Sequence, residues 1–425
     1  MTGILEFIRV HASTVPPLAK FAVIMAIIVG IPPLSRRARL PAVVAFLLSG
    51  VVIGPYGLGI AGEHRPIVEF AAELGKLLLM FFCGLEINLA LFRQTQSRSI
   101  TFGLLTTLIP LLLGTAVGFS FGYGVIAAIV LGSLLASHTL LASTIVAKLG
   151  LTRLEPITVT IRATVLSDTL SLVVFAVCVS SYKTGFSIRG LTLQLVEIVV
   201  FFAVVLLGLS RLGAYLLKKV ENDEDAYFVL LFAILAVAGL LARLINLPDI
   251  VGAFLAGLAV NAAVHDKPAK EKLEFLGNSV FIPIFFIATG FLIDPSVFLH
   301  SLVDKFALAS SVVLALIAGK WLAVEIAGRL FAYSTAARRT MWSLTLPQVA
   351  ATLAATLAAF ATFNPAGQRL IDRDLLNVVL VLMLTTSILG PVLTDRFAHR
   401  LLDDENRDQR PPVPFIAPGE ARRAS

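Results

Sequence analysis

The segment Thr164–Phe175, TVLSDTLSLVVF, places an acidic side chain, Asp168, inside a long apolar run. The run covers about residues 157–182, so Asp168 lies about eleven residues, or ~17 Å of helix, from its start. An ionised group near the middle of a bilayer costs about 2.5–3.5 kcal/mol. Something else in the chain must therefore compensate for Asp168.

Composition places the chain among membrane proteins. Its 425 residues are 57% hydrophobic and only 14% charged, with a mean hydropathy of +0.91, whereas a soluble protein carries about 25% charged residues. Apolar runs of roughly 20 residues recur from end to end, each long enough to cross ~30 Å of hydrocarbon. The alternating ten-residue strands of a β-barrel are not seen. The sequence therefore predicts an all-α polytopic membrane protein.

The apolar runs divide into about thirteen segments. They lie near residues 16–34, 40–59, 68–92, 99–122, 124–148, 157–182, 191–217, 226–246, 249–264, 275–293, 303–333, 341–364 and 375–397. We expect these segments to form one transmembrane exchanger domain over residues 1–398. The charged, proline-rich composition of residues 399–425 predicts a short disordered cytoplasmic tail. No strand followed by GxGxxG is found, so no nucleotide-binding regulatory domain is expected.

Loop charge predicts the orientation. One side of the membrane collects most of the basic residues: Arg36, Arg37, Arg39, Arg93, Arg98, Lys148, Arg153, Lys218, Lys219, Lys267, Lys270, Lys272, Arg338, Arg339, Arg396 and Arg400. The other side has chiefly Arg65, Lys183, Arg189, Lys305, Arg369 and Arg373. We expect a protein of the cell membrane, and the positive-inside rule places its N-terminus outside and its C-terminus in the cytoplasm. The net charge of +7 is thus explained by topology, and no nucleic-acid partner is expected.

Two pairs of segments resemble each other. LPAVVAFLLSG (40–50) matches LPDIVGAFLAG (247–257), and LGKLLLMFFCGLEI (74–87) shares its FF-and-Gly pattern with IFFIATGFLID (284–294). Segments two to six and nine to thirteen would then be five-span units with opposite orientations, as in many secondary transporters. These two units cover about residues 40–182 and 249–398. Chance similarity among small apolar residues is the alternative.

The fifth and twelfth segments, at equivalent places in the two units, contain helix-breaking sequences. SLLASHTLLAST (133–144) crowds Ser, His and Thr at mid-membrane, and SLTLPQVAATLAAT (343–356) contains Pro347 followed by Gln348. Proline frees backbone carbonyls, and interrupted helices in transporters use such groups to hold ions. We therefore predict two broken, site-forming helices; close helix packing through small polar residues is the alternative.

Asp168 has polar neighbours on its own helix. Thr164 and Ser171 share its face and Ser167 lies beside it, so the stripe is expected to face a water-filled cavity. Lys320 is a second charge near mid-span, so a purely structural ion pair with Asp168 is one alternative. The functional alternative is that a proton and a partly dehydrated Na⁺ or K⁺ compete for the carboxylate of Asp168. With alternating access, this competition would give antiport.

The order of several motifs resembles a known family. They are LPAVVAFLLSGVVIGP, LLLMFFCGLEI, LLASHTLLASTIVAKLGL, the Ser167–Asp168 pair, VGAFLAGLAVN, FIPIFFIATGFLID, Gly319–Lys320 and LTLPQVAATLA. Over about nine-tenths of its length, the chain resembles the monovalent cation:proton antiporter-2 family, which has the sodium/proton exchanger fold. The resemblance implies thirteen helices, a dimerisation domain, a mobile core domain with two crossing broken helices, and a homodimer.

The resemblance also implies roles for individual residues. Asp168 corresponds to the carboxylate that binds cation or proton, and Lys320 to the basic residue that competes with the cation. The polar residues of the first crossing helix are Ser137, His138, Thr139 and Thr144, and Gln348 lies on the second. Ser167 replaces the second acid of electrogenic relatives, which leaves Lys320 to pair with Asp168 or Glu197.

The same sequence features are compatible with other functions. The expected substrates are Na⁺ or K⁺ and H⁺, whereas a ligand-gated potassium efflux pathway or channel-like protein on the same scaffold is the first alternative. A non-transporting scaffold or sensor is the second. His138 is either a pH-sensitive element or a packing residue, and Glu86 lies nearer a membrane interface. Cys83 and Cys178 lie in apolar runs without a CxxC motif, so no resident metal or cofactor is expected. No GxSxG motif accompanies Ser167 and His138, so the chain is not expected to be an enzyme.

Overall fold

The structure is a computed structural model that describes residues 16–38, 40–60, 66–85, 96–185, 188–220, 223–264, 268–296 and 303–408. Within these residues the chain is helical, and the single extended pairing is an isolated bridge between Phe363 and Arg369. Eight of the described helices are long and apolar enough to cross a membrane, and four shorter apolar helices accompany them. The prediction of an all-α polytopic membrane protein is therefore confirmed.

The helices follow one another along the chain. They are α2 (Pro17–Arg37), α3 (Ala42–Ile53), α4 (Pro66–Leu85), α6 (Gln96–Ser120), α7 (Val125–Ala136), α8 (Ser143–Lys148), η1 (Leu151–Arg153), α9 (Glu155–Thr184), α10 (Ile188–Ala203), η2 (Val204–Leu209), α11 (Ser210–Lys219), α12 (Glu224–Leu244), α13 (Asp249–Val264), α14 (Pro268–Leu276), η3 (Gly277–Phe281), α15 (Ile282–Gly290), α17 (Phe306–Leu330), α18 (Thr335–Leu344), α19 (Ala350–Phe360) and α20 (Arg373–Asp408). The π-helical turns η2 and η3 join α10 to α11 and α14 to α15 without a break.

Two boundaries differ from the prediction by seven or more residues. The tenth segment begins at α14, seven residues before the expected position 275, because its charged first turns are stabilised by ion pairs such as Lys272–Glu224 at 2.5 Å. The last helix continues to Asp408, so residues 399–408 are helical rather than disordered. Ala398 and Leu401 are buried with Val146 of α8, and this packing extends α20 beyond its apolar stretch. The rest of the predicted tail lies outside the described residues.

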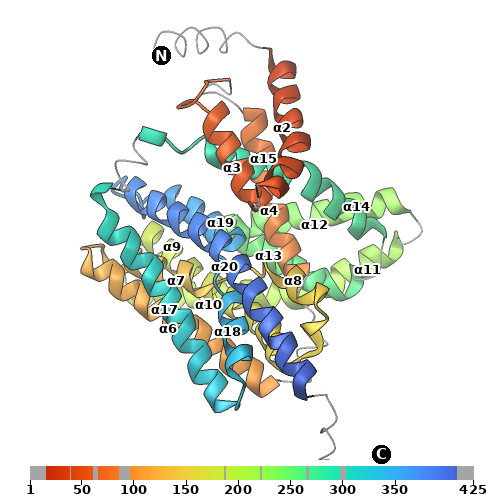
Figure 1. The fold of residues 1–425 in the computed structure, drawn as a ribbon. Helices are drawn as coiled ribbons and strands as arrows, with labels where there is room; N and C mark the ends of the chain where they lie inside the picture. Colours follow the sequence, from red (N-terminus) through yellow and green to blue (C-terminus); the bar gives the residue numbers. More distant parts are fainter. Residues whose placement is uncertain are drawn as a thin grey trace, which may run out of the picture.

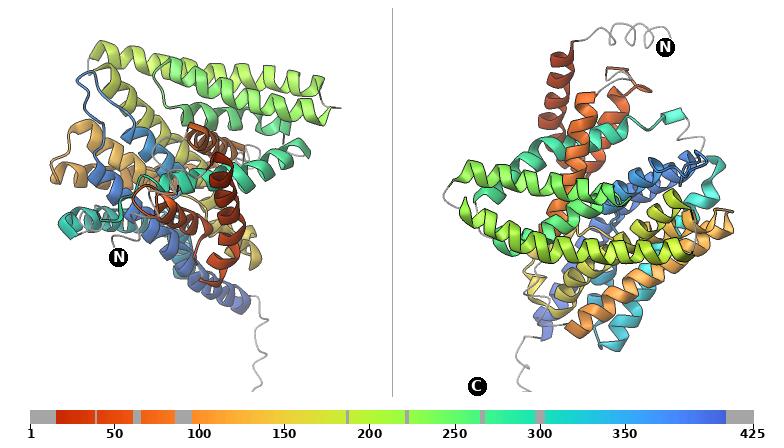
Figure 2. Two further views of the ribbon diagram at one scale, coloured as in Figure 1. Left: turned by 90° about the horizontal axis from the view of Figure 1, so that it is seen from above. Right: turned by 180° about the vertical axis from the view of Figure 1, so that it is seen from behind.

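The helices form two groups (Figure 1, Figure 2). In the group that we name the core group, α6 packs on α7, α9 and α17, and α20 packs on α17, α18 and α19. In the scaffold group, α4 packs on α13 and α15, α3 packs on α2 and α15, and α12 packs on α13 and α14. The helix formed by α10, η2 and α11 contacts both groups, through α9 and α13.

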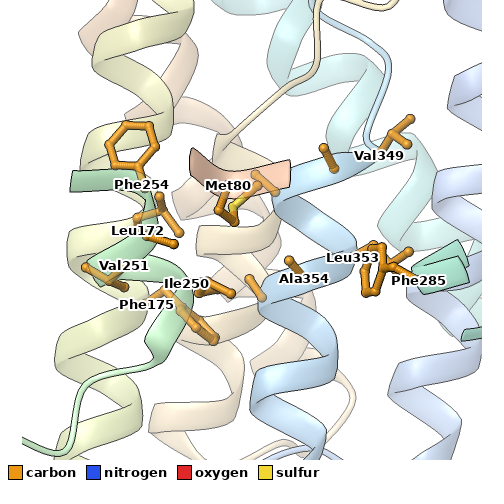
Figure 3. Packing of buried hydrophobic residues seen from close by; sticks show 14 of the residues in the cluster. Met80, Leu172, Phe175, Ile250, Val251, Phe254, Phe285, Val349, Leu353 and Ala354 are labelled. Atoms are coloured by element: carbon orange, nitrogen blue, oxygen red, sulfur yellow. The ribbon is translucent and has the colours of Figure 1, made fainter. Parts of the chain in front are cut away.

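An apolar cluster fills the junction between the two groups. Figure 3 shows Leu172 and Phe175 of α9 with Val251 and Phe254 of α13, and all four are buried. The same view places Met80 of α4 near the α19 residues of the cluster. The core and scaffold groups are therefore in dry contact along part of α9.

Four glycines bring the scaffold helices into backbone contact. A Cβ added at Gly50, Gly84, Gly257 or Gly290 would lie only 2.0 or 2.2 Å from a carbonyl oxygen of the facing helix. Gly50 and Gly290 face each other between α3 and α15, and Gly84 and Gly257 do so between α4 and α13. Small residues allow this approach, which gives dispersion contact where lipid offers no hydrophobic driving force.

The close approach predicts a large stability effect for one methyl group. We expect Gly257→Ala to lower the thermal unfolding midpoint in detergent, because the new Cβ meets backbone that cannot move aside; overpacking of this kind costs about 1–3 kcal/mol. Gly30→Ala is the control, since a Cβ there has nothing within 4 Å. Equal midpoints for the two variants would contradict the packing described here.

Candidate functional site

Two helices are interrupted in the core group, at the places predicted from the sequence. The first stops at Ala136 and resumes at Ser143, and the second stops at Leu344 and resumes at Ala350. Pro347 cannot donate a backbone hydrogen bond, and the Ser, His and Thr side chains of the first break compete with helical hydrogen bonding. The two breaks are in contact, since the Thr139 N–H donates to the Pro347 carbonyl at 2.8 Å. We name this junction the crossing.

Side chains from each break satisfy the backbone of the other. The Gln348 amide Nε2 donates to the Ser137 carbonyl at 2.5 Å, and Thr352 Oγ1 donates to Gln348 Oε1 at 2.6 Å. Thr139 Oγ1 accepts from the Ala350 N–H at 3.3 Å. Ser137, Thr139 and Gln348 therefore lie at the crossing and hold the two breaks together.

Asp168 of α9 lies against the first break. Its Oδ1 accepts a hydrogen bond from the His138 backbone N–H at 3.2 Å, and its side chain remains partly exposed. Thr164 and Ser171, which share its helix face, are buried. The expectation that this whole stripe faces water is thus wrong, because the crossing covers the stripe on both sides of Asp168. Ser171 borders a cavity of about 10 Å³, with room for at most one water molecule.

His138 links the first break to two other helices. Its Nε2 lies 2.9 Å from Thr164 Oγ1, whose own proton is donated to the Thr160 carbonyl, so Nε2 is the protonated nitrogen. Nδ1 is then an acceptor, and Lys320 Nζ lies 3.4 Å from it. Ser167 Oγ also lies 3.3 Å from Nδ1. These bonds assign a neutral, fully engaged imidazole, which favours the packing interpretation of His138 over a pH-sensitive one.

Lys320 of α17 is fully buried, and its ammonium group binds two carbonyls that lack a helical donor, one at the end of α7 and one before Pro110 in α6. Nζ donates to the Ala136 carbonyl at 2.7 Å, where α7 ends, and to the Thr106 carbonyl at 3.0 Å. Thr106 lies four residues before Pro110, which has no N–H to bind that carbonyl inside α6. Lys320 thus replaces two missing helical donors and places a positive charge at the carbonyl end of α7.

The role of Pro110 was not predicted, although its signal is in the sequence. A proline in the middle of an apolar run always frees the carbonyl four residues earlier, and LTTLIPLLL contains that pattern. Gly319 completes the arrangement, because a Cβ there would lie 3.2 Å from Pro110 Cα. The Gly319–Lys320 pair therefore combines close approach to α6 with a donor for its free carbonyl.

Residues 23–398 match the model of the family described as sodium/hydrogen exchanger, transmembrane. The chain belongs to this family. The resemblance noted from the motifs is thereby confirmed.

Several relatives support this membership in the exchanger family. The chain is 43% identical over 385 residues to the Na⁺/H⁺ antiporter NhaS5 of Synechocystis sp., covering 91% of this chain and 55% of that protein. The chain thus spans about half the length of NhaS5. It is 26% identical over 380 residues to the probable Na⁺/H⁺ antiporter 3 of Methanocaldococcus jannaschii, covering 88% of this chain and 94% of that one. The sodium proton antiporter MjNhaP1 of the same organism has a similar fold, with a TM-score of 0.64, 16% identity, and coverage of 91% of this chain and 98% of that one.

One predicted residue of this exchanger-family chain lies away from the site, and two others cannot be placed within the described residues. Glu197 is exposed on α10, whereas Lys320 is fully buried and contacts Thr106, Ala136 and His138, so Glu197 is not its partner. The position was misjudged because hydropathy does not distinguish a lipid-facing or surface acid from one facing the bundle. Thr144 lies in α8, but its side chain is outside the described part of the chain, and so is Glu86.

Helix α20 supplies contacts that the sequence did not indicate. Thr386 Oγ1 accepts from the Gln348 backbone N–H at 3.1 Å, and Thr394 Oγ1 donates to Ser343 Oγ at 2.9 Å. Both hydroxyls lie in an apolar stretch, where a threonine usually indicates only helix packing. They hold the second break and the end of α18 against α20.

Proposed function

We propose that this chain is a secondary-active monovalent cation/proton antiporter, with Na⁺/H⁺ exchange first and K⁺/H⁺ exchange second. The observation that carries the proposal is the carboxylate of Asp168, partly exposed and bound by a backbone N–H where two broken membrane helices cross. The names of the relatives agree with it: NhaS5 is called a Na⁺/H⁺ antiporter. An intramembrane acid of this kind is a functional site by default, because it is costly to retain otherwise.

Competition at Asp168 would couple the two fluxes. A proton and a partly dehydrated alkali cation need the same carboxylate oxygens, so occupancy by one excludes the other. Lys320 acts as a fixed charge-compensating group, because carbonyls of α6 and α7 and the imidazole of His138 engage its ammonium group. Ser137, Thr139 and Gln348 keep the crossing in place around the carboxylate.

One-sided access is supported by the apolar cluster of Figure 3. Asp168 is partly exposed, whereas Leu172 and Phe175, one and two turns farther along α9, are buried against α13. The apolar contact would then close Asp168 off on the side of α9 that faces α13. Movement of the core group along the scaffold group would break this apolar contact and open the other side.

The inverted-repeat architecture is supported by the scaffold glycines. Gly50 touches the carbonyl of Ile287, three residues before Gly290, and Gly257 touches that of Phe81, three residues before Gly84. The reciprocal contacts have the same spacing. Gly290 touches the carbonyl of Leu47, three residues before Gly50, and Gly84 touches that of Phe254, three residues before Gly257. Exchanging the two proposed units maps each contact onto another, as a pseudo-two-fold axis would.

The number of spans and their orientation are proposed from the positions of basic residues. Thirteen spans, an external N-terminus and a cytoplasmic C-terminus in the cell membrane agree with the basic residues at the ends of α2, α11 and α20. A homodimer, formed through the scaffold group, is the expected assembly.

Exchange in proteoliposomes tests the proposal. With a pH-sensitive dye and an imposed pH gradient, Na⁺ should dissipate the gradient at concentrations where choline does not, and K⁺ and Li⁺ added separately would rank the cations. Proton flux that is insensitive to every alkali cation would contradict antiport. Cation current far above carrier turnover, without proton counterflow, would favour the channel-like alternative.

A further inference from the structure

A basic cavity lies on the core group, away from Asp168. It has a volume of about 520 Å³ and lies between α17, α18 and α20. Four arginines line it against one acid: Arg338, Arg339, Arg396 and Arg400 against Glu325. An excess of guanidinium groups in a hollow is suited to phosphate, which arginine binds through two parallel hydrogen bonds.

Glu325 does not neutralise this cavity. Its Oε1 already accepts from Arg338 Nη1 at 2.7 Å and from Arg329 Nε at 2.8 Å. Arg338 Nε is buried without a hydrogen-bond partner in the described structure. Arg396 and Arg400 are exposed at the cavity, and the nearby acid Asp395 lies 3.7 Å from His399 Nδ1. Among the described residues, the cavity therefore contains more guanidinium groups than carboxylates that pair with them.

The surface beside the cavity is apolar. On α20, Ile388, Val392, Arg396 and Arg400 follow at intervals of four residues on one face, and Val392 is 61% exposed. On α17, Trp321 lines the cavity with 52% of its surface exposed, and the exposed Leu314 lies two turns earlier on the same side. Each helix thus passes from an apolar surface to the basic cavity.

Aromatic side chains of α18 and α20 also line the cavity. Trp342 Nε1 donates to the Ile317 carbonyl at 3.1 Å, and its ring centroid lies 6.4 Å from that of Phe397. Arg338 and Arg339 lie in the first two turns of α18, and Arg396 and Arg400 lie beyond the apolar stretch of α20. The basic side of the cavity therefore lies toward the headgroups, and the exposed apolar residues lie deeper.

We propose that this cavity binds the headgroup of an anionic phospholipid. The phosphate would bind the arginines, and the acyl chains would lie along Val392 and Leu314. A free phosphate ion would use the same arginines but would gain nothing from the apolar surface, so the lipid is the better-matched occupant. Basic pockets between membrane helices at the cytoplasmic side are known to bind such headgroups.

The lipid would stabilise the second broken helix. Helix α18 begins beside the cavity and ends at the break, and α20 carries the two threonines that hold the break. A headgroup bound between α17, α18 and α20 would connect all three elements. Binding would therefore raise the stability of the core group without contacting the ion site.

Lipid-dependent thermal unfolding of the purified full chain tests the inference. Phosphatidylglycerol, added to the protein in detergent, should raise the unfolding midpoint in a saturable manner, whereas phosphatidylcholine should not. In the Arg339→Gln/Arg396→Gln variant, the phosphatidylglycerol concentration for half the effect should rise on the order of tenfold to thirtyfold. Arg36→Gln/Arg37→Gln, with the same loss of charge at the end of α2, should respond as the wild type does.

Several results would overturn the inference. An equal shift with phosphatidylcholine, or equal weakening in the α2 control, would show that the cavity does not select the lipid. Inorganic phosphate that reproduces the whole shift would identify a site for a free anion instead. If the double variant does not fold, Arg400→Gln at the exposed end of the cavity serves in its place, and an unchanged lipid response there would also contradict the inference. None of these readouts depends on ion exchange.

Discussion

Asp168→Asn is expected to abolish cation-coupled proton flux and to leave the protein folded. Asparagine has nearly the same shape, and its carboxamide oxygen can still accept the His138 N–H bond. It cannot take up a proton at working pH or supply a negative charge to a cation, so neither substrate would bind. Proteoliposomes containing the variant should show the proton flux of protein-free liposomes, and the unfolding midpoint should equal or exceed that of the wild type.

A matched control separates the site from general charge effects. Asp395→Asn removes one exposed carboxylate of α20, and this variant should exchange at the wild-type rate. Wild-type exchange by Asp168→Asn would contradict the antiport proposal. Loss of exchange together with loss of the folded state would instead indicate that Asp168 is a structural residue, as the scaffold alternative requires.

Lys320→Met is expected to destabilise the protein more than any substitution of a surface lysine. It leaves the Ala136 and Thr106 carbonyls buried without a donor, and only part of this cost is offset by removing a buried charge. We expect the free energy of unfolding to fall by about 2–4 kcal/mol. Thermal or denaturant unfolding in detergent measures the loss, with Lys219→Met at the exposed end of α11 as the control.

Pro110→Ala tests whether Lys320 stabilises the protein by binding the Thr106 carbonyl. Alanine restores an N–H that can bind the Thr106 carbonyl inside α6, so in that background Lys320→Met should cost about 1 kcal/mol less. If Lys320→Met costs the same in both backgrounds, the ammonium group does not compensate for the missing helical donor. A midpoint equal to that of Lys219→Met would contradict the stabilising role of Lys320 altogether.

Much of the fold could be predicted from local patterns. Apolar runs of membrane length indicated an all-α polytopic protein, and Pro347 and the polar run around His138 indicated the two breaks. These features depend on neighbouring residues: a helix needs an apolar surface over its own length, and it breaks where its own donors are missing. The end of α20 was misplaced because Leu401 packs against α8, a contact that no local pattern contains.

The sequence by itself determined that the chain spans a membrane with helices, that two of them are broken, and that Asp168 lies near mid-span between them. Tertiary structure alone decided which groups meet there. Lys320 binds Thr106 and Ala136, which are 214 and 184 residues away, while Glu197 remains on the surface. The physical reason is that hydropathy fixes the depth of a residue in the membrane but not the side of the helix that faces the bundle. That side is set by close packing between helices, as at Gly319 and Pro110, and it determines which buried donor satisfies which buried carbonyl.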